Sequence, residues 1–350
     1  MKGTQGTLAV GEILRGADAP FLPSSGVGPS KVYVEATTRC NLECQFCVRR
    51  AWDEAPGDMA EWTFAAILKG VRALARPPTV LFGGIGEPLA HPCLPEMVAQ
   101  AKSVGARVEL VTNGTLLSRA TGRALIDAGL DLLWVSVDGA TPERYGDLRR
   151  GAALPDVLDN LALFSEGRHA GGRAPEIGIA FVAMRRNIAD LPALLDLAGR
   201  LGVTRFHVSH LLAHTPEMLE ETLYPQVPSP HPPQIGGRCP FIESGAIAIG
   251  WDGSVSPCVP LLHGSRSFLN GGERFTQRWS VGRVTDRDLL ELWNALKFQE
   301  FRQRVKTFSF APCASCGGCG LVHGNGEDCF GNPFPTCGGC LWSKGLISCP

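Results

Sequence analysis

The sequence predicts an α/β fold with a parallel sheet, followed by a small cysteine-rich α+β domain. Strand-like and helix-like patterns alternate from residue 31 to residue 212, which is typical of a parallel sheet with helices outside it. A proline-rich stretch, 213–238, then ends the alternation and is typical of a linker. The cysteines become dense after it. We therefore divide the chain into an N-terminal extension (1–30), an α/β core (31–212), the linker (213–238) and a cysteine-rich domain (239–350).

Each element of the core follows from its apolar spacing and its end signals. Strands are expected where short apolar runs lie between turn residues, at 31–36, 79–82, 107–112, 131–137, 176–183 and 204–211. Helices are expected where apolar residues recur at helical spacing, at 61–75, 93–104, 118–128, 155–165 and 191–201. Ser118 is expected to cap the third of these helices and Gly129 to end it. Six strand–helix units result, which are too few to close an eight-stranded barrel.

Three cysteines lie in one short loop directly after the first predicted strand. Cys40, Cys44 and Cys47 have the spacing C-x3-C-x2-C. Three thiolates on a short loop can converge on one metal centre, and a cubane iron–sulfur cluster usually takes four cysteine ligands. Three ligands would leave one iron open to bind something else. A structural zinc site, which needs four ligands, and three buried thiols are the alternatives. The position of the loop after the first strand favours the cluster.

The loop resembles the signature of the radical SAM enzymes, with Phe46 in the aromatic position before the third cysteine. The resemblance implies that the open iron of a [4Fe–4S] cluster binds S-adenosylmethionine (SAM). One electron then cleaves SAM and yields a 5′-deoxyadenosyl radical, which abstracts hydrogen from the substrate. The resemblance also implies that the six units form a partial (β/α)6 TIM-like barrel. In such a fold the active site lies at the C-terminal ends of the strands.

Further motifs follow the predicted strands, and the resemblance implies that they contact SAM. The segment 82–88 after the second strand looks like the family's GGE motif, and an Asn-Gly turn follows the third strand. After the fourth strand, two polar side chains at alternate positions share one face. We prefer Arg150 over Arg149 as the partner of the SAM carboxylate because Arg150 directly precedes Gly151. Plain turns and solvated arginines would explain these residues without a ligand. The expected SAM-binding residues are Gly83, Gly84, Glu87, Asn113, Ser136, Asp138 and Arg150.

The cysteine-rich domain carries a second resemblance. Cys239 and Cys258 enclose an apolar run and a hairpin signal, with the spacing C-x13-G-x4-C around Gly253. This pattern resembles the start of the SPASM extension, which holds auxiliary iron–sulfur clusters. The remaining cysteines have gaps that depart from the usual SPASM arrangement: Cys313, Cys316, Cys319, Cys329, Cys337, Cys340 and Cys349. We predict two auxiliary [4Fe–4S] clusters with one cysteine to spare; one cluster plus a zinc ion is the alternative.

The composition argues against several classes of function. A formal net charge of −1 provides no field that would attract nucleic acid or an anionic membrane. No apolar run reaches the roughly 18 residues of a membrane span, and no secretory signal is expected. We therefore expect a cytoplasmic protein, in which clustered thiols bind metal rather than form disulfides. Cys93, at a helix start, is expected to be a buried structural thiol.

The resulting prediction is an enzyme that cleaves SAM reductively and modifies or matures a peptide or protein, with a ferredoxin- or flavodoxin-like electron donor. The tail 331–342 resembles SPASM proteins associated with the maturation of tungsten-cofactor oxidoreductases. A small-molecule cofactor precursor is the alternative substrate. A non-catalytic iron–sulfur electron-transfer or scaffold protein is the alternative class. Glu327 and Asp328, beside Cys329, are the candidates for a catalytic base.

Overall fold

A computed structural model of the chain describes residues 28–168, 174–225, 237–316 and 319–350. Most of the predicted N-terminal extension and residues 226–236 of the predicted linker lie outside the described residues. The core strands run parallel in the order of the sequence, as predicted. They are β1 (Lys31–Val34), β2 (Thr79–Phe82), β3 (Arg107–Thr112), β4 (Leu132–Ser136), β5 (Glu176–Ala183) and β6 (Arg205–His210).

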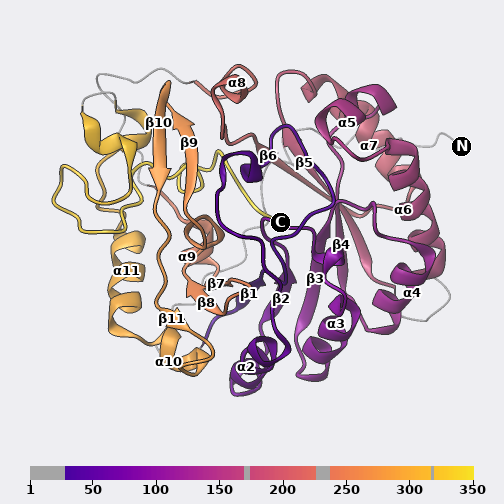
Figure 1. Cartoon of the computed structure of the whole chain (residues 1–350), viewed down its shortest axis with the longest axis horizontal. Coiled ribbons are helices and arrows are strands. Elements are labelled where there is room, and N and C mark those ends of the chain that lie inside the picture. The colour runs from indigo at the N-terminus through magenta and orange to yellow at the C-terminus, as the bar shows by residue number, and fades with distance from the viewer. Residues whose placement is uncertain (1–27, 169–173, 226–236, 317–318) are drawn as a thin grey trace, which may run out of the picture.

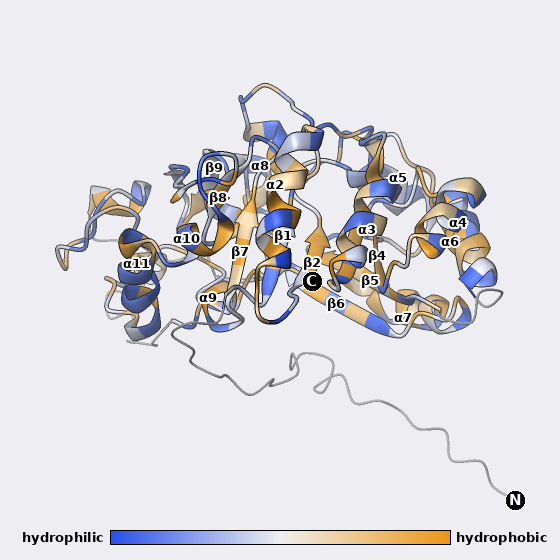
Figure 2. Ribbon diagram, turned by 90° about the horizontal axis from the view of Figure 1, so that it is seen from below, coloured by the Kyte–Doolittle hydropathy of each residue, from blue (hydrophilic) through white to orange (hydrophobic). Residues whose placement is uncertain are grey.

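Helices cover the outer face of these strands on one side of the molecule (Figure 1). They are α2 (Glu61–Arg72), α3 (Leu94–Ser103), α4 (Arg119–Asp127), α5 (Pro142–Leu148), α6 (Leu154–Arg168) and α7 (Leu191–Arg200). The Ser118 hydroxyl accepts a hydrogen bond from the Thr121 amide, 3.1 Å away, and so caps α4 as predicted. Figure 2 shows apolar residues along the central strands and polar residues on the outward sides of the helices. This partition matches the amphipathic spacing from which the helices were predicted.

Helix α5 was not predicted from the sequence. It begins with Thr141, whose hydroxyl accepts from the Arg144 amide, and Pro142 occupies its first position. Both are ordinary signals for a helix start. The helix is only seven residues long, so the apolar periodicity that revealed the longer helices is too short to see.

The cysteine-rich part of the chain continues the same sheet. Strand β7 (Ala246–Ile249) pairs in parallel with β1, and β8 (Ser254–Ser256) and β11 (Gly282–Arg283) extend the sheet beyond it. The sheet therefore has nine strands, in the order β11-β8-β7-β1-β2-β3-β4-β5-β6. The predicted hairpin joins β7 to β8. The apolar run before it starts instead with a short helix, α9 (Pro240–Glu243), because Pro240 opens a helical turn and Gly245 leaves it at a φ of +65°.

The rest of the C-terminal part flanks this sheet (Figure 1). Strands β9 (Ser265–Leu269) and β10 (Gly272–Thr276) form a separate antiparallel pair. Helices α10 (Leu289–Trp293) and α11 (Leu296–Thr307) follow, and the short helix α8 (Pro216–Leu219) comes after β6. None of the described helices is long and apolar enough to cross a membrane. Single 3-10 turns occur at Val48–Ala51, Pro88–Ala90, Ile188–Asp190, Val259–Leu261, Cys313–Ser315 and Gly320–His323.

The C-terminal residues return to the open side of the partial barrel. The His210 amide donates to the Leu346 carbonyl at 3.3 Å, and the Ser348 amide donates to the Ser209 hydroxyl at 3.1 Å. At the other side of the gap, the Lys31 ammonium donates to the carbonyl of Pro350 at 2.9 Å. The segment 346–350 thus contacts β6 at the sheet edge and β1 near the middle of the sheet, and fills space between them.

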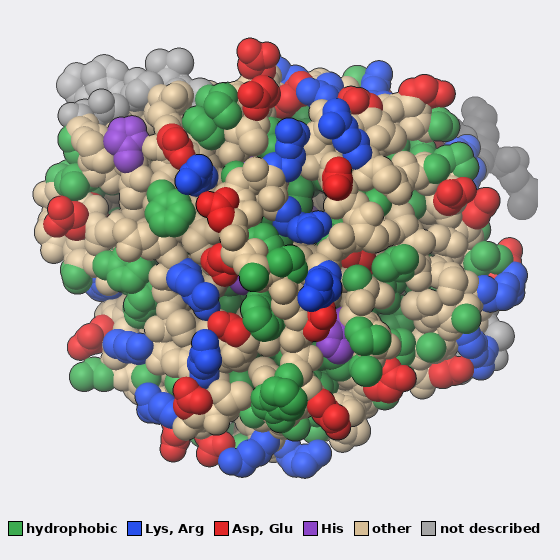
Figure 3. All heavy atoms as spheres, in the orientation of Figure 1, with side chains coloured by type: hydrophobic (Ala, Val, Ile, Leu, Met, Phe, Trp, Pro, Cys, Tyr) green, Lys and Arg blue, Asp and Glu red, His purple; other side chains and the backbone are tan. Residues whose placement is uncertain are grey.

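The face of the molecule seen in Figure 3 carries lysines and arginines interspersed with aspartates and glutamates. No broad area of a single charge stands out on that face, which agrees with the near-zero net charge of the sequence.

Candidate functional site

The three-cysteine loop leaves the C-terminal end of β1 and is fixed to the segment that ends α5. The Glu43 amide donates to the Arg150 carbonyl at 3.0 Å, and the Gln45 amide donates to the Leu148 carbonyl at 2.9 Å. The Asn41 side chain accepts from the side-chain amide nitrogen of Asn113, 2.9 Å away, at the end of β3. Backbone bonds from the end of α5 and a side-chain bond from the end of β3 therefore hold the loop in place.

Two of the three loop thiols lie in an environment that favours their protonated form. Burial raises the pKa of Cys44 to about 11, although the nearby Arg149 guanidinium acts in the opposite direction. Burial also raises the pKa of Cys47. These thiols keep their protons near neutral pH in the absence of metal, and iron that binds them displaces the protons. Cluster formation on this loop therefore competes with protons at Cys44 and Cys47.

The glycine loop after β2 packs directly on the strand end and on the start of the cysteine loop. Gly84 has a φ of +144°, and a Cβ atom there would lie 2.7 Å from the Glu35 carboxylate. A Cβ atom on Gly86 would lie 2.3 Å from the Thr37 carbonyl. Only glycine fits at either position, which explains physically why the motif is rich in this residue.

Glu87 holds the glycine loop to the end of β3. Its buried carboxylate accepts hydrogen bonds from the Asn113 amide at 2.6 Å, the Thr112 hydroxyl at 2.7 Å and the Leu89 amide at 3.0 Å. Burial raises the pKa of Glu87, and these donors act against that rise. Because its oxygens are already bonded within the protein, Glu87 acts here as a support for the loop.

Asp138 and Arg149 form a buried ion pair behind the cysteine loop. The Asp138 side chain is fully buried; it accepts from Arg149 Nε at 2.7 Å and from the Val182 amide at 2.6 Å. The Arg149 guanidinium also lies over the Phe46 ring, 5.5 Å from its centroid. Arg150, the arginine preferred from the sequence, is exposed, and its carbonyl binds the cysteine loop.

Spacing to Gly151 could not separate the two arginines, but helix α5 can. Tyr145 and Arg149 are one helical turn apart and both are buried. The Thr141-Pro142 helix start, had it been recognised in the sequence, would have predicted that Arg149 and not Arg150 faces the interior.

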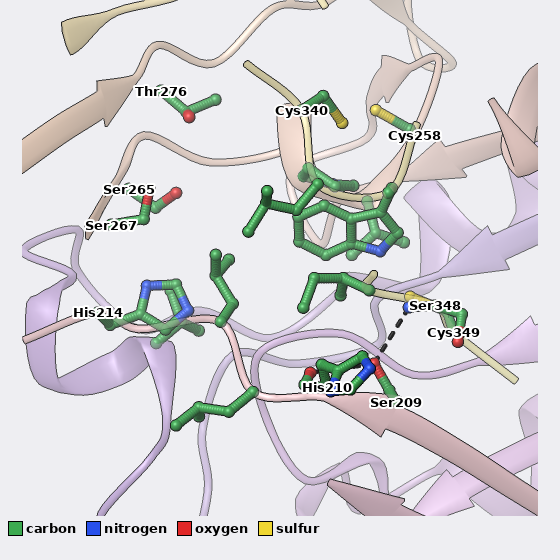
Figure 4. A pocket seen from close by; sticks show the side chains of 18 of the residues that line it. Ser209, His210, His214, Cys258, Ser265, Ser267, Thr276, Cys340, Ser348 and Cys349 are labelled. Carbon is green, nitrogen blue, oxygen red and sulfur yellow. Dashed lines mark hydrogen bonds between the residues drawn. The ribbon is translucent and has the colours of Figure 1, made fainter. Parts of the chain in front are cut away.

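A cavity of about 420 Å³ lies between the cysteine loop and the C-terminal part of the chain. Cys47, Gly84 and Ser136 line one side of it. Figure 4 shows Cys258 and Cys340 at another side with their sulfur atoms turned toward each other, and Ser209, His210, Ser348 and Cys349 across from them. The structure thus brings part of the predicted SAM site to the same space as two of the C-terminal cysteines. Five predicted SAM-binding residues do not line this space: Gly83, Glu87, Asn113, Asp138 and Arg150.

The cavity wall is mainly apolar, and its polar side chains are mostly histidines, serines and threonines. Among the described residues that line it there is no aspartate or glutamate. Burial lowers the pKa of three lining histidines, His207, His210 and His214, so their imidazoles are neutral near pH 7. The Nδ1 atom of His210 is buried without a hydrogen-bond partner in the described structure. Neutral imidazoles and hydroxyls can accept or donate hydrogen bonds to a polar organic molecule.

The C-terminal cysteines gather around two further, small cavities. Four of them line one cavity and form what we call the outer cysteine group: Cys313, Cys316, Cys319 and Cys329. Four others line the second and form the inner cysteine group: Cys239, Cys258, Cys337 and Cys340. The described residues contain no group of three or more His, Cys, Asp or Glu side chains placed to hold a single metal ion. The eight cysteines therefore line two separate small cavities, with four thiols at each.

Three of the four inner thiols also border the large cavity, whereas the outer group reaches the surface. Burial raises the pKa of Cys239 to about 12 and that of Cys258 and Cys337 well above the ordinary value. All thirteen cysteines are free. Each ring of four matches the ligand count of a cubane cluster.

Three other expectations concern single residues. Cys349 lines the large cavity and belongs to neither cysteine group. Cys93 was expected to be buried, and this is wrong: it is exposed, because it precedes α3 at its solvent side. Glu327 is exposed, and Asp328 is buried with its carboxylate bonded to the Ala311 and Phe330 amides, so neither lines the cavity.

A buried histidine between two carboxylates is a feature that was not predicted from the sequence. His263 Nε2 lies 2.7 Å from Glu35 Oε2, and its Nδ1 lies 3.0 Å from Glu54 Oε2. Glu35 also accepts from the Ile85 amide of the glycine loop at 3.1 Å. Burial alone would lower the pKa of His263, but the two carboxylates outweigh it and raise that pKa. No local pattern reveals this network, because Glu35 and His263 are 228 positions apart.

Comparison with known proteins agrees with this geometry. The model of the radical SAM superfamily matches residues 34–198, and that of the SPASM iron–sulfur cluster-binding domain matches residues 239–320. A Pyrococcus furiosus protein named tungsten-containing aldehyde ferredoxin oxidoreductase cofactor-modifying protein is 31% identical over 347 residues, covering 91% of this chain and 96% of its own. The chain belongs to the radical SAM superfamily. It is thus an enzyme whose [4Fe–4S] cluster binds SAM, and its SPASM domain carries auxiliary iron–sulfur clusters.

More distant members of the family share parts of the chain or its fold. The PqqA peptide cyclase of Gluconobacter oxydans is 33% identical over 188 residues, which is 52% of this chain and 49%, about half, of that protein. The structure of Streptococcus suis SuiB bound to precursor peptide SuiA matches with a TM-score of 0.61 at 15% identity, covering 83% of this chain and 70% of SuiB. Native anSMEcpe with bound AdoMet matches with a TM-score of 0.58 at 17% identity, covering 83% and 86%. The predicted partial barrel followed by a cysteine-rich domain is confirmed.

Proposed function

We propose that this radical SAM enzyme modifies the organic cofactor, or a cofactor precursor, of a tungsten-containing oxidoreductase. The observation that carries the proposal is the similarity to the Pyrococcus furiosus cofactor-modifying protein, which extends along 91% of this chain. The cavity of about 420 Å³ supports it, because pockets of about 300–1,000 Å³ are the size that takes small organic ligands. Its apolar wall carries scattered imidazoles and hydroxyls and the guanidinium of Arg274, which suits a compact molecule with polar edges.

The cluster, when bound, supplies the electron that cleaves SAM to methionine and the 5′-deoxyadenosyl radical. Cys40, Cys44 and Cys47 hold that cluster. Gly84 and Ser136 face SAM from the strand ends, and Gly83 and Asn113 form the turns beside them. Glu87 and the Asp138–Arg149 pair keep these segments in position from behind.

The inner and outer cysteine groups each hold one auxiliary [4Fe–4S] cluster in this proposal, and Cys349 is the spare cysteine. The inner cluster borders the substrate cavity. The outer cluster lies where Cys319 and Cys329 are exposed, so a ferredoxin- or flavodoxin-like donor could reach it. We assign the protein to the cytoplasm, since thiolate-held clusters need a reducing compartment.

A peptide or protein substrate, as predicted from the sequence, is the second candidate. The observation in its favour is the 33% identity of part of the chain to PqqA peptide cyclase, a relative named for a peptide.

The test of the proposed function is anaerobic reconstitution followed by incubation with SAM and dithionite. We expect 5′-deoxyadenosine from the intact chain and none from the C40A/C44A/C47A variant. Adding the organic cofactor extracted from a tungsten oxidoreductase should stimulate 5′-deoxyadenosine formation and change the mass of the cofactor. Stimulation by the oxidoreductase polypeptide but not by the extracted cofactor would favour the second candidate.

Iron analysis tests the cysteine assignment. The C40A/C44A/C47A variant should keep about eight irons, because each cubane holds four. Replacing Cys313 and Cys316 in that background should leave about four, and so should replacing Cys337 and Cys340. Cys349→Ser and the exposed control Cys93→Ser should each keep the full iron content. Loss of four irons in Cys349→Ser would contradict the assignment.

A further inference from the structure

Arg274 is a buried arginine in β10 with no carboxylate partner. Only 5% of the residue is exposed. Within the described part of the chain, no aspartate or glutamate forms an ion pair with it, and its Nη1 donates to the Val322 carbonyl. A buried charge without a counter-charge is strongly unfavourable. The residue lines the large cavity, and the described polypeptide places no carboxylate beside its guanidinium to balance the charge.

The guanidinium lies between the two cysteine groups. A Cβ atom on Gly339 would lie 2.5 Å from Arg274 Cζ, so the guanidinium occupies space beside the residue that precedes Cys340 of the inner group. Val322, to which it donates, lines the small cavity of the outer group. Arg274 thus touches the surroundings of both groups at once.

The electrostatics point the same way. Burial lowers the pKa of Arg274, and three cysteines act against that effect when they are deprotonated, as they are in a cluster: Cys340 and Cys337 of the inner group and Cys313 of the outer group. Two other cations act on these cysteines. Lys344 acts on Cys313 and Cys340 but is only partly buried, and Arg304 acts on Cys337. Arg274 is the most buried of the three cations.

We propose that Arg274 is the shared counter-charge of the two auxiliary clusters and raises the reduction potential of both. This inference rests on the proposed assignment of one cluster to each cysteine group. A fixed positive charge stabilises the more negative, reduced form of a nearby cluster, and its effect is large in a buried setting where water does not screen it. Because one guanidinium serves both clusters, it raises their potentials together and leaves the difference between them little changed.

Gly339 is part of this arrangement. A side chain at this position would occupy the place of the guanidinium. We therefore expect Gly339→Leu to displace Arg274 and to reproduce the effect of its removal, although residue 339 carries no charge.

The experiment is a redox titration of the auxiliary clusters followed by electron paramagnetic resonance, in the C40A/C44A/C47A background so that only these clusters contribute. Arg274→Met should lower both midpoint potentials by at least about 59 mV, which is a tenfold change in a one-electron equilibrium. Arg266→Met is the matched control, because Arg266 lies on the neighbouring strand β9 and its side chain is 56% exposed. It should leave both potentials unchanged. Arg274→Lys, which keeps the charge, should hold both potentials close to those of the parent protein.

Unchanged potentials in Arg274→Met with about eight irons present would overturn the proposal, and so would a shift confined to one cluster. If Arg274→Met loses auxiliary iron, the iron content of Arg274→Lys decides between charge and shape. Full iron in Arg274→Lys supports the role of charge. Loss of iron in Arg274→Lys shows that the shape of the side chain matters and overturns the proposal. The cysteine assignment fails separately, because in that case the background variant itself would not hold about eight irons.

Discussion

At the scale of single residues, the neighbouring arginines 149 and 150 have opposite surroundings. Arg149 is buried against Asp138, and Arg150 is exposed. Arg149→Met leaves the Asp138 carboxylate buried without its cation, which costs about 3–5 kcal/mol of unfolding free energy. Arg150→Met should change it by no more than about 0.5 kcal/mol. Urea unfolding of the metal-free variants measures both, and SAM binding to the reconstituted variants should fall in Arg149→Met only. Loss of SAM binding in Arg150→Met alone would instead support Arg150 as the SAM partner.

Glu87 allows a second test of a buried support. Glu87→Gln replaces one acceptor oxygen by an NH2 group that faces existing donors, the Asn113 amide or the Thr112 hydroxyl. A buried donor left without an acceptor costs about 1–3 kcal/mol. We expect that loss of unfolding free energy, together with weaker SAM binding. Glu96→Gln on the exposed side of α3 is the control and should change neither quantity. Equal behaviour of the two variants would show that Glu87 does not hold the loop.

How much of the site the sequence could predict depended on whether its residues are neighbours in the chain. Cys40, Cys44 and Cys47 were recognisable because three thiols within one short loop are typical of a metal centre. No local pattern marks Glu35 or His263, because they become a pair only when the fold brings Glu35 Oε2 and His263 Nε2 to within 2.7 Å of each other. Arg274 was missed for the same reason.

At the scale of elements, strands and longer helices were predictable and short helices were not. Strands β2, β3 and β5 have the predicted bounds, because each is an apolar run closed by turn residues. Helix α5, with seven residues, and α9, with four, are too short for periodicity, and only the residues at their ends mark them: Thr141-Pro142 for α5, and Pro240 and Gly245 for α9.

The His263 network joins three elements, and its strength should depend on pH. His263 has a raised pKa, so its contribution to stability is complete below its unfolded value of 6.5 and is lost as the pH rises through the higher folded value. Burial alone would raise the pKa of Glu54, but the His263 bond and charge, the Gly264 amide and the Arg278 charge lower it, so that contribution is complete above 4.5 and is lost in more acid solution. The network therefore stabilises most between about pH 4.5 and 6.5.

His263→Ala leaves the buried Glu35 carboxylate without its cation and should cost about 3–5 kcal/mol in that window. The deficit relative to the unmodified protein should shrink above pH 7, as measured by denaturant unfolding of the metal-free protein across the pH range. His323→Ala, at an exposed site, should show no such dependence. A deficit for His263→Ala that is constant from pH 5 to pH 9 would mean that packing, and not charge, carries the effect.

At the scale of the whole molecule, the cysteine-rich part and the barrel share one sheet. Strand β7 adds to the edge of β1, and all four of its residues are buried. A strand buried on both faces reads as a continuous apolar run, which is the signature of a central parallel strand. The apolar run was visible in the sequence, and its pairing with the following strand of the hairpin was predicted. Its pairing with β1 was not predicted, because local spacing does not indicate which distant strand is the neighbour.

The shared sheet predicts that the barrel is not stable without the cysteine-rich part. A chain ending at residue 238 would lose the partner of β1 from Lys31 to Val34 and would expose that edge to other molecules. It would also lose buried side chains such as Ile247, Ile249 and Leu289 from the main core, each of which contributes about 1.5–3 kcal/mol. We expect this fragment to aggregate in size-exclusion chromatography and to show no cooperative melting. The full chain with serine in place of the outer cysteine group is the control: it loses one cluster, keeps the sheet and should remain folded. A monomeric fragment that melts as cooperatively as that control would contradict this view, because the nine-stranded sheet would then be two independently stable parts placed side by side.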